Sequence, residues 1–152
     1  GRRPADGGNA DGAYCAIDFL EYIKQANEQR FIVVQIEDPE PLPELDAIAA
    51  VPGIDMLFYG AGDFSQGIGT PADWSNPLIA STRKRIAEAA RAHGKFAGLV
   101  CGPANVEEYA AMGYQFFSIG ADVIGLAEHC RGLMGDFNKG TAKAAPKMYG
   151  GK

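Results

Sequence analysis

Four short runs of apolar residues recur along the chain, and within each run the apolar positions are continuous rather than alternating with polar ones. The runs are rich in β-branched and aromatic residues, which favour strands. Continuous apolarity is typical of a parallel strand that is covered on both faces. We therefore predict four parallel strands, at "FIVVQI" (31–36), "IDMLFY" (54–59), "KFAGLVC" (95–101) and "YQFFSI" (114–119).

Segments with helical periodicity separate and follow these runs. Asn76 before Pro77 fits an N-cap with proline at the first helical position, and Gly94 stands where a left-handed C-cap is expected. An amphipathic helix over 17–29, preceded by a glycine-rich loop, comes before the first strand. Each strand is followed by a predicted helix, over 41–50, 76–92, 103–112 and 122–135.

A series of βα units forms either an open doubly wound sheet or a closed eight-stranded barrel. A complete barrel needs about 200 residues or more, whereas this chain has 152 and begins with a helix that has no preceding strand. We therefore predict an α/β fold that is the C-terminal half of a (β/α)₈ TIM barrel, with four βα units and a leading helix. Residues 1–138 would belong to this domain, and the tail 139–152 would be flexible or would contact a neighbouring subunit.

Composition narrows the classes of partner. The chain carries 14 Lys+Arg against 19 Asp+Glu, a formal charge of -5, so we expect no nucleic-acid partner. It has neither a secretion signal nor an apolar stretch near the ~18 residues of a membrane span, so we expect no membrane contact. Cys15, Cys101 and Cys130 lack a CxxC spacing, and we interpret them as small core thiols of a reducing, cytoplasmic compartment rather than as disulfides or zinc ligands.

Acidic residues follow the first two predicted strands. Parallel α/β proteins hold ligands at the carboxyl ends of their strands, and Glu37 and Asp63 are both placed there. Two carboxylates that face each other repel unless a positive group lies between them. Mg²⁺ or Mn²⁺ would suit these ligands better than zinc, since no Cys/His cluster accompanies them. The alternative is that Glu37 caps a helix or pairs with an arginine, and that Asp63 starts a turn.

The glycines around Asp63, in "FYGAGDFSQGIG" (58–69), suggest an anion site next to this acidic pair. Gly60 and Gly62 let the backbone approach a ligand, and the amides of Gly62 and Asp63 could point at an anion. A 2-oxo acid would offer a carboxylate to the amides and a keto oxygen to the metal. The stretch lacks the lysine of a P-loop, so it is a poor phosphate site.

The other side chains that could take part in chemistry give weaker evidence for a functional role. His93 stands at a helix end, where a histidine most often interacts with the helix dipole, and His129 lies within the last helix. Cys101 has no matched base, Asp38 is interpreted as solvent-facing or as a helix cap, and Trp74 is interpreted as a loop cover. We therefore assign no catalytic residue from spacing alone.

The segment "VVQIEDPE...LDAIAAVPGIDMLFYGAGDFSQGIG", together with "GKFAGLVC" and "MGYQFFSIGADV", resembles the HpcH/HpaI aldolase family. Members of that family are metal-dependent, class II pyruvate aldolases of (β/α)₈ barrel fold. The resemblance implies that Glu37 and Asp63, 26 positions apart, are metal ligands for Mg²⁺ or Mn²⁺, with Co²⁺ as a further candidate. It also implies that Gln35 contacts substrate and that the amides of Gly62 and Asp63 hold the pyruvate carboxylate.

Two further positions carry over. Ala61 stands beside the carboxylate site, where many members have proline, and Val100 matches an apolar residue that shapes the aldehyde pocket. The family's histidine base, its aspartate partner and its enolate-stabilising arginine belong to the first half of the barrel, so none is expected in this chain. The chain alone is therefore expected to be inactive.

The activity that the resemblance implies is carbon–carbon bond formation or cleavage. Pyruvate would lose a methyl proton, and the metal-stabilised enolate would add to an aldehyde to give a 4-hydroxy-2-oxo acid. Family members are commonly hexameric, so a homo-oligomer is expected. Two alternatives stay open: a citrate-lyase-like enzyme acting on acyl thioesters, for which we see no basic coenzyme A cluster, and a half-barrel that binds a keto acid without turning it over.

Overall fold

The computed structural model describes residues 5–137 of the chain. The chain divides into two compact units, residues 1–32 and residues 33–152. No helix within the described range combines the length and the apolarity needed to cross a lipid bilayer. The predicted tail, residues 139–152, lies outside the described residues.

The first unit contains the 3-10 segment η1 (Ala10–Cys15) and the helix α1 (Phe19–Gln29). Asp18 caps α1, because its side chain accepts hydrogen bonds from the amides of Leu20 and Glu21 at 3.1 and 3.2 Å. The predicted leading helix is thus confirmed, whereas η1 occupies part of a segment that was predicted to be a loop.

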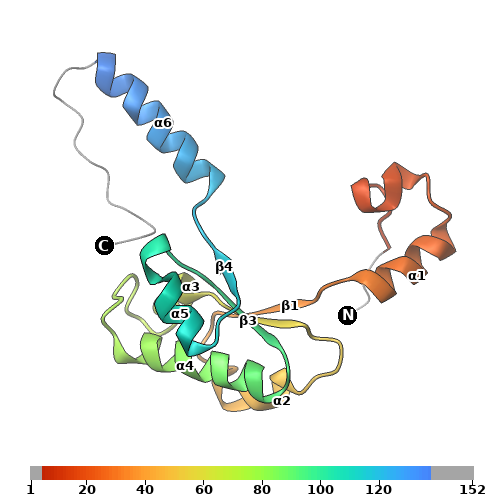
Figure 1. Ribbon diagram of the computed structural model, residues 1–152, viewed down its shortest axis with the longest axis horizontal. Helices are drawn as coiled ribbons and strands as arrows, with labels where there is room; N and C mark the ends of the chain where they lie inside the picture. The colour runs from red at the N-terminus through yellow and green to blue at the C-terminus, as the bar shows by residue number, and fades with distance from the viewer. Residues whose placement is uncertain (1–4, 138–152) are drawn as a thin grey trace. The chain divides into compact units, whose positions relative to one another are not determined.

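The second unit is built on a sheet of four parallel strands, labelled in Figure 1, in the order β1-β2-β3-β4. All four predicted strands are confirmed, each a few residues shorter than its apolar run, and every neighbouring pair is parallel. The strands are β1 (Val33–Ile36), β2 (Met56–Tyr59), β3 (Phe96–Val100) and β4 (Phe116–Ser118).

Helical segments follow every strand, as predicted. Asn76 caps α4 by accepting from the amide of Leu78 at 3.0 Å, and Gly94 after that helix has a left-handed φ of 66°, so both capping predictions are confirmed. One helix, α3, was not predicted, because its seven-residue sequence contains two glycines. The segments are η2 (Leu42–Glu44) and α2 (Leu45–Ala49) after β1, α3 (Ala61–Gly67) and α4 (Pro77–Ala92) after β2, η3 (Pro103–Asn105) and α5 (Val106–Met112) after β3, and α6 (Asp122–Phe137) after β4.

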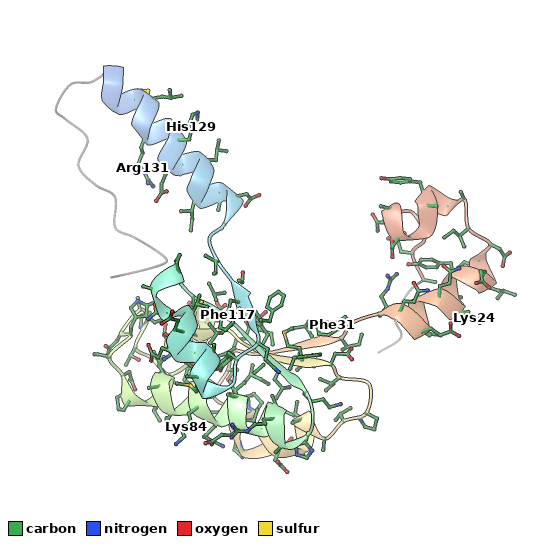
Figure 2. All side chains as sticks on the ribbon, viewed as in Figure 1. Lys24, Phe31, Lys84, Phe117, His129 and Arg131 are labelled. Carbon is green, nitrogen blue, oxygen red and sulfur yellow. The ribbon has the colours of Figure 1, made fainter. Side chains whose placement is uncertain are left out.

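The hydrophobic core lies between one face of the sheet and its helices. Helix α4 contacts both central strands, and Figure 2 shows Lys84 on its outer side. Phe117 of β4 is partly buried against the same cluster. Because side chains alternate along a strand, every second residue points into this core. The buried core residues from the sheet and α4 are Ile36, Leu57, Tyr59, Ala97, Leu99, Ile79, Ile86, Ala87 and Ala90.

The other face of the sheet is also apolar but is far more accessible. Val33, Phe96, Val100 and Phe116 are exposed by 48, 48, 47 and 49% of their surface. The prediction that both faces of the strands are covered is therefore confirmed for one face only, within the described part of the chain. The same face also carries Gln35 at the end of β1 and Glu37 directly after it, two polar residues of the predicted binding site.

Candidate active site

The site is built on the carboxyl ends of β1 and β2, which lie side by side. The register pairs Ile36 with Tyr59, the last residues of the two strands. The pairing continues one step further, because the amide of Gly60 donates to the carbonyl of Ile36 at 3.0 Å. Glu37 therefore stands next to Gly60 where the two strands end.

The distances from a Cβ added at Gly60 show how close Glu37 lies to Gly60. An ideal Cβ built on Gly60 would lie 2.7 Å from the Cβ of Glu37 and 2.9 Å from its Oε2. Gly60 is buried and Glu37 is half-buried. The carboxylate of Glu37 thus lies across the end of β2.

Gln35 orients this carboxylate. Its side-chain amide Nε2 donates a hydrogen bond to Glu37 Oε2. Residues two apart in a strand share a face, so Gln35 and Glu37 both belong to the accessible face of the sheet. Of the two alternatives for Glu37, helix cap or arginine partner, neither describes this contact.

Asp63 is carried by the first turn of α3, three residues after Gly60. The helix is anchored by Phe64, which is 0% exposed and meets the Tyr59 ring edge-on at a centroid distance of 5.6 Å. The Ser65 hydroxyl closes the turn by donating to the Gly62 carbonyl at 2.7 Å. With its neighbour Phe64 buried in the core, Asp63 is left exposed at the surface.

Val100 extends the same row of residues. It pairs with Ser118 of β4, and one step earlier Leu99 pairs with Tyr59. Continuing these registers by one residue aligns Glu37, Gly60 and Val100 across the ends of three strands. Val100 is half exposed on this face, so it adds an apolar wall beside the polar group.

The remaining predicted residues of the site lie on α3. Ala61 is partly buried and packs against the core, while Gly62 is exposed and an added Cβ there would meet nothing within 4 Å. Gly62 and Asp63 occupy the second and third positions of the helix, whose amides have no intrahelical acceptor by the geometry of the α-helix. The structure therefore brings Gln35, Glu37, Gly60 and Val100 to one edge of the sheet, with Asp63 in the turn that follows.

The donor chemistry of this edge suits a hard divalent ion. Two carboxylates supply charged oxygen, the ligand type that Mg²⁺ and Mn²⁺ prefer. Within residues 5–137 no three His, Cys, Asp or Glu side chains gather closely enough to hold a metal ion. An ion held by two carboxylates would leave its other coordination positions to water or substrate oxygens, which is the usual arrangement for Mg²⁺.

Two of the cysteines depart from their prediction. Cys15 and Cys130 are exposed, so the interpretation of these two as core thiols is wrong, whereas Cys101 is half-buried and packs against the hydrophobic core. Burial raises the pKa of the Cys101 thiol, which disfavours the nucleophilic thiolate. Cys101 follows β3 beside the site, but it has the properties of a packed thiol.

The two histidines and Asp38 do not belong to the group formed by Glu37, Gly60 and Val100 at the strand ends. His93 Nε2 contacts Asp46 Oδ1 at 2.8 Å, and His129, labelled in Figure 2, is exposed on α6. Asp38 is exposed and accepts from the Glu40 amide at 3.1 Å, as its interpretation as a solvent-facing or capping residue requires. Sequence reasoning treated Gly60 as a permissive backbone position and missed that Gln35 and Glu37 fill the space a side chain there would take, which depends on strand pairing.

A parallel sheet with helices packed against it defines an α/β protein, and comparison with known proteins identifies its family. The HpcH/HpaI aldolase/citrate lyase family matches residues 7–128. The chain belongs to this family.

Individual relatives agree. The chain is 33% identical over 133 residues to a hydroxypyruvate/pyruvate aldolase of Pseudomonas aeruginosa, covering 86% of this chain and 50% of the relative. It is similar to the crystal structure of an HpcH/HpaI aldolase/citrate lyase family protein from Burkholderia cenocepacia J2315, with a TM-score of 0.73 and 28% identity over 90% of this chain and 53% of that one. It is also similar to the crystal structure of citrate synthase SbnG, with a TM-score of 0.70 and 30% identity over 79% of this chain and 49% of that one. The chain thus spans about half the length of these relatives.

Proposed function

We propose that the protein containing this chain is a divalent-metal-dependent aldolase that forms or cleaves 4-hydroxy-2-oxo acids from pyruvate and an aldehyde. The observation that carries the proposal is the placement of Glu37 against Gly60 at the joined ends of β1 and β2, with Asp63 in the next helical turn. Family membership and the aldolase names of the relatives support it.

Each residue of the site has a role in this proposal. Glu37 and Asp63 would hold Mg²⁺ or Mn²⁺, which when bound supplies a Lewis acid that polarises the keto oxygen of a 2-oxo acid. The amides of Gly62 and Asp63, with Ala61 before them, would hold the substrate carboxylate at the start of α3. Gln35 would contact the substrate, and Val100 would shape the pocket for the aldehyde.

Proton transfer is assigned outside this chain. The histidine base and the arginine that the resemblance implies would come from the first half of a (β/α)₈ barrel, of which this sheet is the second half. Two observations support the half-barrel proposal: the chain covers about half of its relatives, and the accessible face of its sheet carries apolar side chains of the kind that fill a barrel interior. A homo-oligomer and a cytoplasmic location stay predictions.

A metal titration tests the proposal directly. Mn²⁺ binding to the purified chain would be followed by electron paramagnetic resonance, comparing Glu37→Gln and Asp63→Asn with the parent. Each variant keeps the shape of the side chain and removes its charge, and we expect Mn²⁺ affinity to fall by roughly tenfold or more. Asp38→Asn is the matched control, because Asp38 is adjacent to Glu37 in sequence but is exposed and bonded to the Glu40 amide. Equal affinity of all four proteins contradicts the proposal.

An activity assay tests the half-barrel. We expect no cleavage of a 4-hydroxy-2-oxo acid by the isolated chain, and metal-dependent cleavage by the longer protein that is lost with EDTA and restored by Mn²⁺ or Mg²⁺. Cleavage by the isolated chain above a Glu37→Ala control overturns the assignment of the base to the other half.

A second candidate is supported by the similarity to a citrate synthase structure. An enzyme of that kind would act on an acyl thioester at the same strand ends and would need a site for coenzyme A. The longer protein distinguishes the two: release of free thiol from acetyl-CoA in the presence of a 2-oxo acid favours the thioester reaction, and pyruvate release from a hydroxy-oxo acid favours the aldolase.

A further inference from the structure

Gly60 occupies a crowded position at the joined ends of β1 and β2. An ideal Cβ there would lie 2.7 Å from the Cβ of Glu37, 2.9 Å from Oε2 of Glu37 and 2.9 Å from Nε2 of Gln35. Separations under about 3 Å are too short for non-bonded carbon atoms, whose optimal distance is about 3.5–4.0 Å. The hydrogen-bonded Gln35–Glu37 pair therefore fills the space that a side chain at position 60 would take.

The backbone conformation of Gly60 does not require glycine. Its φ and ψ are -91° and 72°, so φ is negative and open to other residues. Gly94 and Gly113, by contrast, have φ values of 66° and 113° in the left-handed region that favours glycine. What excludes a side chain from Gly60 is contact with its neighbours.

The contact with the Glu37 Cβ cannot be relieved by turning a side chain, because that atom is fixed by the backbone of the residue after β1. Relief requires the ends of β1 and β2 to separate, which would stretch the 3.0 Å hydrogen bond from the Gly60 amide to the Ile36 carbonyl. The contacts with Nε2 of Gln35 and Oε2 of Glu37 can be relieved only by rotating these two side chains, which breaks or moves their hydrogen bond.

We infer that Gly60 is a positioning residue. Because it has no side chain, Gln35 and Glu37 can form their hydrogen bond in the space beside it, and this bond fixes the direction of the Glu37 carboxylate. The inference rests on the proposed function, since the direction of this carboxylate matters because Glu37 is a proposed metal ligand. It goes beyond that function by assigning a role to a residue to which the proposed function gives none.

Two variants and one control test the inference in the full 152-residue chain. Gly60→Ala adds the excluded Cβ. Gln35→Ala removes the amide that orients Glu37 and adds no atom. Gly125→Ala is the matched control, because it makes the same chemical change within α6, where a Cβ would meet nothing within 4 Å.

Two readouts separate positioning from metal binding. The first is nuclear magnetic resonance of the Gln35 side-chain amide and of the Glu37 carboxylate carbon in metal-free protein. The second is the dissociation constant for Mn²⁺. In Gly60→Ala we expect the Gln35 amide signals to move and the Mn²⁺ dissociation constant to rise about 10- to 100-fold, the usual effect of losing a group that orients a ligand. In Gly125→Ala we expect neither change.

Each outcome decides a definite point. Gly60→Ala that keeps the Gln35 signals and binds Mn²⁺ within about twofold of Gly125→Ala overturns the inference. If the parent chain binds no Mn²⁺, the metal role in the proposed function fails, and the metal-free spectra still decide whether Gly60 positions the pair. If Gly60→Ala does not fold, Gln35→Ala decides: an unmoved Glu37 carbon signal shows that Glu37 does not depend on the pair, and the inference is wrong.

Discussion

Replacing Phe64 by alanine tests how the helix that carries Asp63 is held. Phe64 is 0% exposed and its ring meets Tyr59 edge-on. Truncating a fully buried phenylalanine costs about 3–5 kcal/mol of unfolding free energy, through lost burial and the cavity left behind. The aromatic pair contributes about 0.5–1.5 kcal/mol beyond area burial. We therefore expect a loss near 4 kcal/mol, a large fraction of the roughly 5–15 kcal/mol that stabilises a domain.

The assay is urea unfolding followed by far-ultraviolet circular dichroism. With a urea slope of about 2 kcal/mol per molar, the expected loss lowers the unfolding midpoint by about 2 M. Phe64→Leu keeps most of the volume and should cost less than half as much. Trp74→Ala is the control, because Trp74 is 49% exposed in the same unit, and about 1 kcal/mol or less is expected. A loss under about 1 kcal/mol in Phe64→Ala would refute the argument that Phe64 anchors α3.

Three further predictions concern a helix cap, a crowded glycine and two buried tyrosines. Asn76→Ala removes the cap of α4 and should cost about 1 kcal/mol by thermal denaturation, whereas Asn76→Asp should retain most of the stability. Gly98→Ala should cost about 1–3 kcal/mol in urea unfolding, because its Cβ would lie 2.6 Å from the Met56 sulfur. Burial raises the pKa of the Tyr59 and Tyr114 phenols, so the folded state keeps their protons after the unfolded chain loses them near pH 10. The unfolding free energy should therefore fall as pH rises above about 10, and an unchanged value there contradicts the assigned burial.

The sequence alone determined the order of elements in the second unit. Each predicted strand is continuously apolar, and each helix that was predicted has apolar periodicity or a capping signal such as Asn76. These signals are local, because a segment's pattern reports which of its faces are buried. For the same reason α3 was missed: two glycines within seven residues weaken the helical signal, and the burial of Phe64 that compensates for them is a tertiary contact.

The sequence also placed Glu37 and Asp63 after neighbouring strands, which is where ligands bind in parallel α/β proteins. It could not show what surrounds them. The hydrogen bond from Gln35 to Glu37 and the exclusion of a side chain at Gly60 depend on the spacing between β1 and β2. That spacing is set by pairing of residues more than twenty positions apart, and no local pattern contains it.

What the amino-acid sequence settled by itself is the class of the fold and the edge of the sheet at which chemistry is expected, because both follow from periodicity and chain order. What the tertiary structure decided is the register of the strands, the face of the sheet that stays accessible, and the close packing of Gly60 against the Gln35–Glu37 pair. These features arise only when distant segments pack together, since a side chain's contacts depend on which residues the fold brings opposite it.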